Sequence, residues 1–238
     1  MSLRKQIILH LLLLAGILAA FELTGLDLAV QDRFYLGQRR WLVDPKWKVP
    51  RLVFYDGPKV LLVAFGGACL AGWIGSYRLK RWRALRLPSL RMALALAIIP
   101  VTVAGLKAAT NVYTPAQTQR YGGPRPYVKV LERYPQDAKR PSRGKGWPAA
   151  HASGGFALMM LYHALRRRGW RVGGLCLGLA AGWTMGLYHT LDGAHFLSHT
   201  FVTMSLAWII VLLIVLLSDA RQRASLFTAI GRRRRAGI

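Results

Sequence analysis

The sequence predicts an all-α integral membrane protein, a bundle of six transmembrane helices with a functional site at its outer face. Hydrophobic residues make up 53% of the 238 residues, yet 34 basic side chains oppose 9 acidic ones and the formal charge is +25. Membrane spans reconcile these facts, because they satisfy their own backbone as helices while basic residues collect in loops that face anionic headgroups. We expect a single membrane domain covering residues 1–238.

Other classes of protein fit this composition less well. A nucleic-acid-binding protein can reach the same charge, but it does not need long uncharged runs alternating with arginine clusters, so no nucleic-acid partner is expected. Both cysteines, Cys69 and Cys176, fall inside apolar runs. They indicate small core residues and favour neither a disulfide framework nor a thiolate metal site.

Six segments are apolar enough to cross a bilayer, whose core needs about 20 residues per helix. They are residues 6–23, 59–76, 92–109, 152–165, 172–188 and 195–217, of which the fourth is short. The first has the basic start and apolar stretch of a signal peptide. No small-residue cleavage site obviously follows it, so we expect a retained span.

The connections predict the orientation of these spans. Residues 1–5, 77–91, 166–171 and the basic tail 219–238 hold more than half of the 34 basic residues and one acidic residue, Asp219. The positive-inside rule places them in the cytoplasm.

The opposite face has a short loop, 190–194, and two long ones. Trp41 and Trp47 make loop 24–58 suitable for an interfacial segment, and loop 110–150 is rich in Gly, Pro and basic residues.

Four side chains that can bind a phosphate or transfer protons are predicted to lie together at this outer face. Lys107 ends the third span, His151 begins the fourth, and His195 and His199 begin the sixth. Lysine and arginine donors suit a phosphate, while one histidine attacks phosphorus and another protonates the leaving oxygen. The i,i+4 spacing lets His199 accept from Nδ1–H of His195 and fix its tautomer.

Three stretches in order resemble the type 2 phosphatidic acid phosphatase superfamily: KAATNVYTP from Lys107, WPAAHAS from Trp147 and YHTLDGAHFLSH from Tyr188. The superfamily's motifs are K-x6-R-P, P-S-G-H and S-R-x5-H-x3-D, and the likeness covers roughly residues 106–219. The resemblance implies that Lys107 binds phosphate, that His151 is the general acid and that His195 is a nucleophile forming a phosphohistidine. We expect no cofactor and no metal.

These stretches depart from the first and third motifs at four positions. Thr114 stands where the first motif has Arg, Tyr188 and His189 stand where the third has Ser-Arg, and His199 replaces the closing Asp. The run TNVYTPAQTQRYGGPRPY also resembles a subgroup with a Tyr-Gly-Gly-x-x-Pro-Tyr segment, whose members have His at the closing position.

The lost arginines need substitutes. We expect Arg120 and Arg125, which flank the Tyr-Gly-Gly turn, to supply phosphate-binding cations, and His189 to bind phosphate at the position of a family arginine. Asp192 lies three residues before the expected nucleophile and would repel a phosphate dianion unless a cation neutralises it. A degraded site, a changed substrate and a carboxylate that points away all remain open.

The resulting expectation is a lipid phosphatase in a bacterial cytoplasmic membrane, acting from the periplasmic face on a lipid-linked phosphate or pyrophosphate. Lipid A, phosphatidylglycerol phosphate and polyprenyl pyrophosphate are candidate substrates. Three alternatives stay open: a phosphotransferase between lipids using the same residues, a non-catalytic relative that binds or transports lipids, and a metal site formed by His189, His195 and His199.

Overall fold

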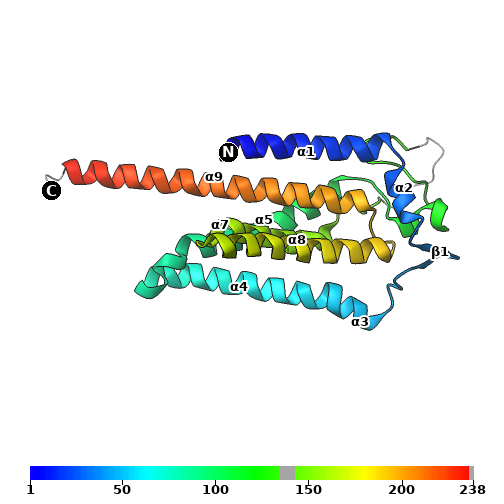
Figure 1. The fold of residues 1–238 in the computed structure, drawn as a ribbon, viewed down its shortest axis with the longest axis horizontal. Helices are drawn as coiled ribbons and strands as arrows, with labels where there is room; N and C mark the ends of the chain where they lie inside the picture. The colour runs from blue at the N-terminus through cyan, green and yellow to red at the C-terminus, as the bar shows by residue number, and fades with distance from the viewer. Residues whose placement is uncertain (135–142, 236–238) are drawn as a thin grey trace.

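The computed structural model describes residues 1–134 and 143–235, with side chains described up to residue 222. It is an elongated bundle in which long helices run side by side (Figure 1). The helices are α1 (Leu3–Leu23), α2 (Leu26–Gln31), α3 (Lys48–Arg51), α4 (Gly57–Arg78), α5 (Arg86–Ala109), α6 (Ala150–Ala157), α7 (Leu161–Ala164), α8 (Arg168–Leu191) and α9 (Leu197–Arg235). Shorter turns are the π-helix η1 (Leu52–Asp56) and the 3-10 turns η2 (Lys80–Leu85), η3 (Pro115–Gln117), η4 (Gln119–Tyr121) and η5 (Leu158–Met160).

Within the described residues, four helical segments are long and apolar enough to cross a membrane. They are Leu3–Leu23, Lys48–Arg78, Lys80–Ala109 and Leu197–Gln222, which correspond to the first, second, third and sixth expected spans. The fourth expected span is divided between α6, η5 and α7, and the fifth is α8, which carries several glycines. The chain is therefore a mainly helical membrane protein, and its count of six spans stays a prediction.

Exposed apolar side chains agree with a membrane setting. Leu12 on α1 is 65% exposed, and Leu61 and Val63 on α4 are 71% and 70% exposed. Contiguous apolar surface of this kind is unfavourable in water and is normal where lipid tails surround a helix. The internal core lies deeper, where Ile99 of α5 and Phe156 of α6 are completely buried.

Glycines allow α8 to lie very close to α6 and η5. A Cβ at Gly178 would stand 2.4 Å from the backbone nitrogen of Met159, and one at Gly182 would stand 2.2 Å from the Phe156 ring. Small residues spaced by four along a helix permit this close approach of two backbones. The packing holds the start of α6 beside the end of α8.

The expected outer loop 24–58 contains more structure than its sequence predicts. It holds α2, a short hairpin of β1 (Tyr35–Gly37) and β2 (Arg40–Trp41), and a helical segment that begins at Lys48. Pro58 has no N–H to donate, and in a regular helix its ring clashes with a carbonyl of the preceding turn. The wider π-helical turn η1, which ends two residues before Pro58, relieves this clash.

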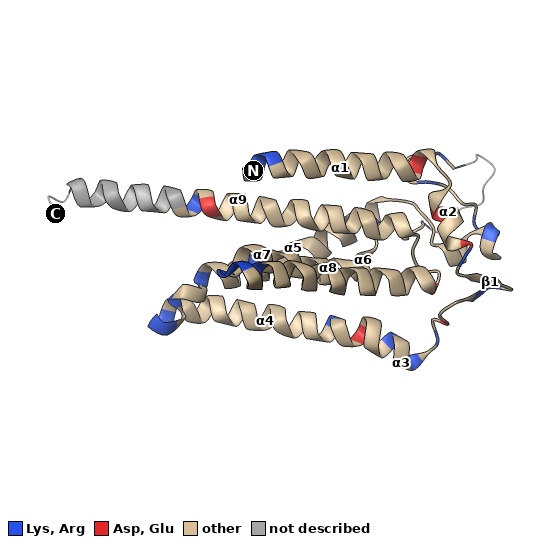
Figure 2. Ribbon diagram, viewed as in Figure 1, with Lys and Arg blue, Asp and Glu red and all other residues tan. Residues whose placement is uncertain are grey.

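The two ends of the bundle differ. One end carries α2, the hairpin and the described parts of loop 110–150, of which residues 135–142 lie outside the described residues (Figure 1). The other end carries the α4–α5 and α7–α8 connections, where Figure 2 shows a concentration of basic residues. The expected tail 219–238 is not separate from the last span, because α9 continues to Arg235.

Candidate active site

Four histidines meet at the end of the bundle that carries the hairpin. His151 lies in the first turn of α6, His189 in the last turn of α8, His195 in the turn before α9, and His199 at the start of α9. Ring centroids are 4.3 Å apart for His151 and His189, and 5.4 Å apart for His151 and His195. Residues separated by more than 40 positions thus form one cluster.

His195 and His199 contact each other through ring nitrogens. Their Nδ1 atoms lie 3.3 Å apart, and the two residues are 1% and 2% exposed. The contact is the one that the spacing predicts, but its origin differs, because α9 begins at Leu197 and His195 precedes it. The turn after α8, rather than a helix face, brings His195 over His199.

Hydrogen bonding at Gly146 favours one arrangement of the protons on these two rings. The Gly146 backbone forms a hydrogen bond with His199 that favours its protonated form, as a carbonyl acceptor does, and the Gly146 nitrogen donates to the Val112 carbonyl. With the two Nδ1 atoms in contact, this bond fits a His199 that donates from Nε2 and accepts at Nδ1. In that arrangement His195 carries its proton on Nδ1, and the lone pair of its Nε2 is free. Burial lowers the pKa of His195 well below its usual value, so the ring stays neutral.

Asp192 holds His189. Its Oδ2 accepts from Nδ1 of His189 at 2.9 Å, and its Oδ1 accepts from the Ala194 nitrogen at 2.9 Å. The carboxylate is therefore engaged by its own turn and by His189, and the three readings that the sequence leaves open for Asp192 stay untested. Nε2 of His189 is buried and has no hydrogen-bond partner among the described residues. This nitrogen is therefore available to a ligand.

Two lysines supply positive charge beside the histidines. Lys107, in the last turn of α5, acts electrostatically on His151, His195 and His199. Lys59 near the start of α4 acts on His151 as well. Sequence reasoning missed Lys59, because it appears there only as the first residue of a span.

The two arginines expected to bind phosphate are engaged elsewhere or lie over a ring. Arg120 forms an ion pair with Asp32 at 2.6 Å, and the Tyr121 hydroxyl donates to the same carboxylate. The guanidinium of Arg125 lies over the ring of Tyr113, 5.5 Å from its centroid. A role for either arginine in phosphate binding stays a prediction.

Tyr55 of η1 packs edge-on against both His151 and His189, with ring centroids 4.8 and 5.1 Å away. It also opens onto a cavity of about 760 Å³ that His151 and Lys59 line. The cavity runs between α4 and α5 as far as Trp73, and its walls are mostly apolar. No sequence motif marks Tyr55, and only the extension of the helix to Lys48 reveals it.

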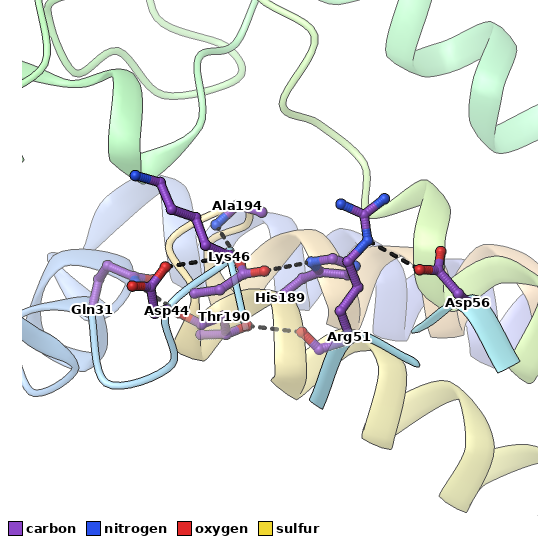
Figure 3. A network of polar contacts seen from close by, with 10 residues as sticks. Gln31, Asp44, Lys46, Arg51, Asp56, His189, Thr190 and Ala194 are labelled. Carbon is purple, nitrogen blue, oxygen red and sulfur yellow. Dashed lines mark hydrogen bonds and ion pairs between the residues drawn. The ribbon is translucent and has the colours of Figure 1, made fainter. Parts of the chain in front are cut away.

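Segment 27–41 holds the turn that carries His195. Gln31 donates to the Thr190 carbonyl at 2.8 Å, a contact that Figure 3 shows beside His189. Gly193 has φ +76°, and a Cβ there would lie 2.3 Å from the indole of Trp41. A glycine is therefore required both by the backbone conformation and by the close approach of Trp41.

Asp27 supports the same turn from α2. It accepts from the backbone nitrogen of Ser198 at 2.9 Å and from the Ser198 hydroxyl. Burial raises the pKa of Asp27 to about 6, and hydrogen bonds from Ser198 oppose this rise. Sequence reasoning missed this contact, since nothing local pairs residues 171 positions apart.

The side-chain geometry does not favour the metal alternative. Among the described side chains, those of residues 1–134 and 143–222, no group of three or more His, Cys, Asp or Glu residues is arranged to hold a metal ion. The Nδ1 atoms of His195 and His199 lie 3.3 Å apart in hydrogen-bond contact, which differs from two ligand atoms that converge on one ion.

Comparison with known protein families gives one match. The family described as the PAP2 superfamily matches residues 88–223, more than half of the chain. The match includes Lys107 and all four clustered histidines, whereas Asp27, Trp41, Tyr55 and Lys59 precede it. Comparisons with curated proteins and with solved structures returned no match.

Proposed function

Because the chain belongs to the PAP2 superfamily, whose members are generally phosphatases, we propose that it hydrolyses a lipid-linked phosphate or pyrophosphate through a phosphohistidine on His195. The contact between Nδ1 of His195 and Nδ1 of His199 carries this proposal. With His199 as the acceptor, this contact leaves Nε2 of His195 unprotonated, and a neutral imidazole with a free lone pair is the form that attacks phosphorus.

The first step forms a bond between Nε2 of His195 and phosphorus while the bond from phosphorus to the lipid oxygen breaks. His151, whose ring lies 5.4 Å from that of His195, donates a proton to the leaving oxygen. Burial lowers the pKa of His151 to about 3 in the free site, and a bound phosphate dianion opposes this by favouring the imidazolium form that the donation requires. In the second step His151 takes a proton from water, the water oxygen attacks phosphorus, and inorganic phosphate leaves as His195 is restored.

His189, Lys107 and Lys59 bind the phosphate oxygens in this proposal. When protonated, His189 donates from Nδ1 to Asp192 and from Nε2 to a phosphate oxygen, which gives it the charge of the arginine it replaces. Asp192 then stabilises that cation and is not free to repel the substrate. The two lysines act as point charges on the same group.

The cavity between α4 and α5 supports a lipid substrate. It begins at Tyr55, Lys59 and His151 and reaches Trp73. The 18 residues from Tyr55 to Trp73 span about 27 Å at 1.5 Å per residue, close to the thickness of a bilayer's hydrocarbon core. A long hydrocarbon chain in this cavity would leave its phosphate at the histidines.

Orientation follows from the positive-inside rule. The bundle end opposite the histidines carries the basic connections that this rule places in the cytoplasm (Figure 2). This arrangement supports our proposal that the site faces the periplasm of a bacterial cytoplasmic membrane. Cysteine labelling at Lys145 and at Arg168 should report opposite sides of the membrane. Labelling of both from one side would contradict the assignment.

Phosphate release by the purified protein in detergent tests the function. The panel should contain lipid A, phosphatidylglycerol phosphate and polyprenyl pyrophosphate, each assayed with and without EDTA. We expect release that EDTA leaves unchanged and that His195→Ala abolishes, with His10→Ala as the matched control far from the site. Metal-restored activity would overturn the histidine mechanism. Lipid binding without turnover would favour the non-catalytic relative, and transfer of labelled phosphate to a second lipid would identify a phosphotransferase.

A further inference from the structure

A second cavity lies at the opposite end of the bundle from the histidines. Its volume is about 720 Å³, and it is lined by the end of α4, η2, the start of α5, the end of α7 with the two residues after it, and α9 between Ser218 and Gln222. Its basic lining residues are Arg83, Arg86, Arg91, Arg166, Arg221 and His163. Arginines from the clusters that the sequence analysis interprets as topology signals therefore line one cavity.

Two of these arginines hold the cavity together. Arg91 is 8% exposed and joins α5 to α9 through the hydroxyl of Ser218 and the carboxylate of Asp219. Arg86 donates to the Ser76 carbonyl at 3.0 Å and lies over the ring of Tyr77, 4.0 Å from its centroid. These contacts satisfy both guanidinium groups within the protein.

The other three arginines have no acidic partner. Arg83, Arg166 and Arg221 are exposed, and no ion pair is formed by them among the described residues. The sequence supplies no alternative, since it has no acidic residue in 57–131, in 143–191 or after Asp219. The cavity therefore carries a positive charge that the chain itself does not neutralise.

The remaining walls are apolar or amphipathic. Trp73, Tyr77, Leu87 and Leu90 line the cavity beside the arginines. The Nε2 atom of His163 is buried without a hydrogen-bond partner within the described residues. A free anion would leave these apolar walls in contact with water, whereas a phospholipid would cover them with the start of its chains.

We propose that this cavity binds the phosphate headgroup of an anionic phospholipid. Basic pockets between helices at the cytoplasmic end of membrane proteins have the chemistry that such headgroups require. The site is distinct from the histidine cluster, because the 22 residues of α9 between His199 and Arg221 span about 33 Å. The bound headgroup links η2, the α7–α8 connection and α9 at an end where arginines would otherwise repel one another.

The test compares two variants of equal charge. The first, Arg83→Gln/Arg166→Gln/Arg221→Gln, removes the three unpaired arginines. The matched control, Lys80→Gln/Arg81→Gln/Arg167→Gln, removes three exposed cations at the same end that do not line the cavity. Thermal unfolding in detergent is measured with added phosphatidylglycerol, phosphatidylcholine or inorganic phosphate, and lipid retention is measured by native mass spectrometry.

We expect phosphatidylglycerol to raise the Tm of the wild type and of the control by several degrees, and phosphatidylcholine to leave it unchanged. The first variant should lose the Tm shift and retain about tenfold less phosphatidylglycerol. Substitution of the same three arginines by Lys should keep part of the Tm shift, because the charge remains. Equal shifts in the first variant and the control would overturn the site. An equal shift with inorganic phosphate would overturn its assignment to a lipid.

Discussion

The carboxylate of Asp27 accepts both the backbone N–H and the hydroxyl of Ser198, a residue that lies between His195 and His199. Ser198 is in the first turn of α9, where N–H groups have no partner inside the helix and a negative charge is favourable. A residue outside the family match thus fixes the end of the helix that carries the proposed reaction. The proposed site consequently extends beyond residues 88–223.

Removing this carboxylate should impair both stability and turnover. Asp27→Ala leaves the nitrogen and hydroxyl of Ser198 buried without an acceptor, at a cost of about 1–3 kcal/mol. We expect a lower Tm and a lower kcat with a smaller change in KM, because the histidines shift while the lipid cavity is unaltered. Asp44→Ala is the control, since Asp44 caps only the local turn at Lys46. A variant with unchanged kcat would show that the contact does not position the histidines.

Asp27 should also give the protein a particular dependence on pH. Its pKa rises from 3.8 to about 6 through burial, with Glu22 raising it further and Lys129 lowering it. The folded carboxyl therefore binds its proton more tightly than the unfolded one, so the free energy of unfolding falls as pH rises through this window and is constant above it. Asp27→Asn removes this contribution.

We expect the stability of Asp27→Asn, relative to the wild type, to improve between about pH 4 and pH 6 and then to stay constant. Chemical denaturation in detergent across this range measures the difference. Parallel curves for the two proteins would mean that Asp27 titrates normally.

His199 is predicted to act through the tautomer of His195. His199→Ala should reduce kcat by about 10²-fold or more, by analogy with the loss of an orienting partner from a catalytic histidine. His199→Asp places a carboxylate where the superfamily motif has one, and a carboxylate accepts from Nδ1–H of His195 at least as well as an imidazole does. We expect it to retain activity, with a shifted pH profile. Equal losses in both variants would indicate that His199 only packs against its neighbours.

The turn at Gly193 offers a test of preorganisation. Gly193→Ala introduces a Cβ at positive φ and 2.3 Å from the Trp41 ring, so Trp41 or the turn must move. We expect a loss of stability above about 1 kcal/mol and a larger fall in kcat. Gly173→Ala is the control, because its Cβ meets open space within α8. Similar kcat values for both variants would exclude a strict requirement for this turn.

The sequence predicts parts of this molecule that depend on local pattern. Apolar runs locate four of the expected spans, and the spacing of His195 and His199 predicts their contact. What it leaves open depends on long-range partners. Arg120 is 88 residues from Asp32, so a basic residue beside a glycine turn appears free for phosphate when it is in fact paired. The orientation of the Asp192 carboxylate could not be predicted from the sequence either, because it depends on how the turn after α8 folds.

His189 provides the sharpest test of how the site compensates for its missing arginines. If its Nε2 donates to phosphate while Asp192 holds Nδ1, His189→Ala should lower kcat/KM by about tenfold or more, the loss of one charge-assisted hydrogen bond. His189→Arg places a permanently charged donor at the same position and should recover part of the activity that His189→Ala loses. Asp192→Asn still accepts from Nδ1 but removes the negative charge beside the ring, so it should lower kcat/KM by less than His189→Ala does. Steady-state kinetics of the three variants and of the control His10→Ala separate these effects. A kcat/KM of His189→Ala equal to that of the wild type would show that His189 does not bind the phosphate.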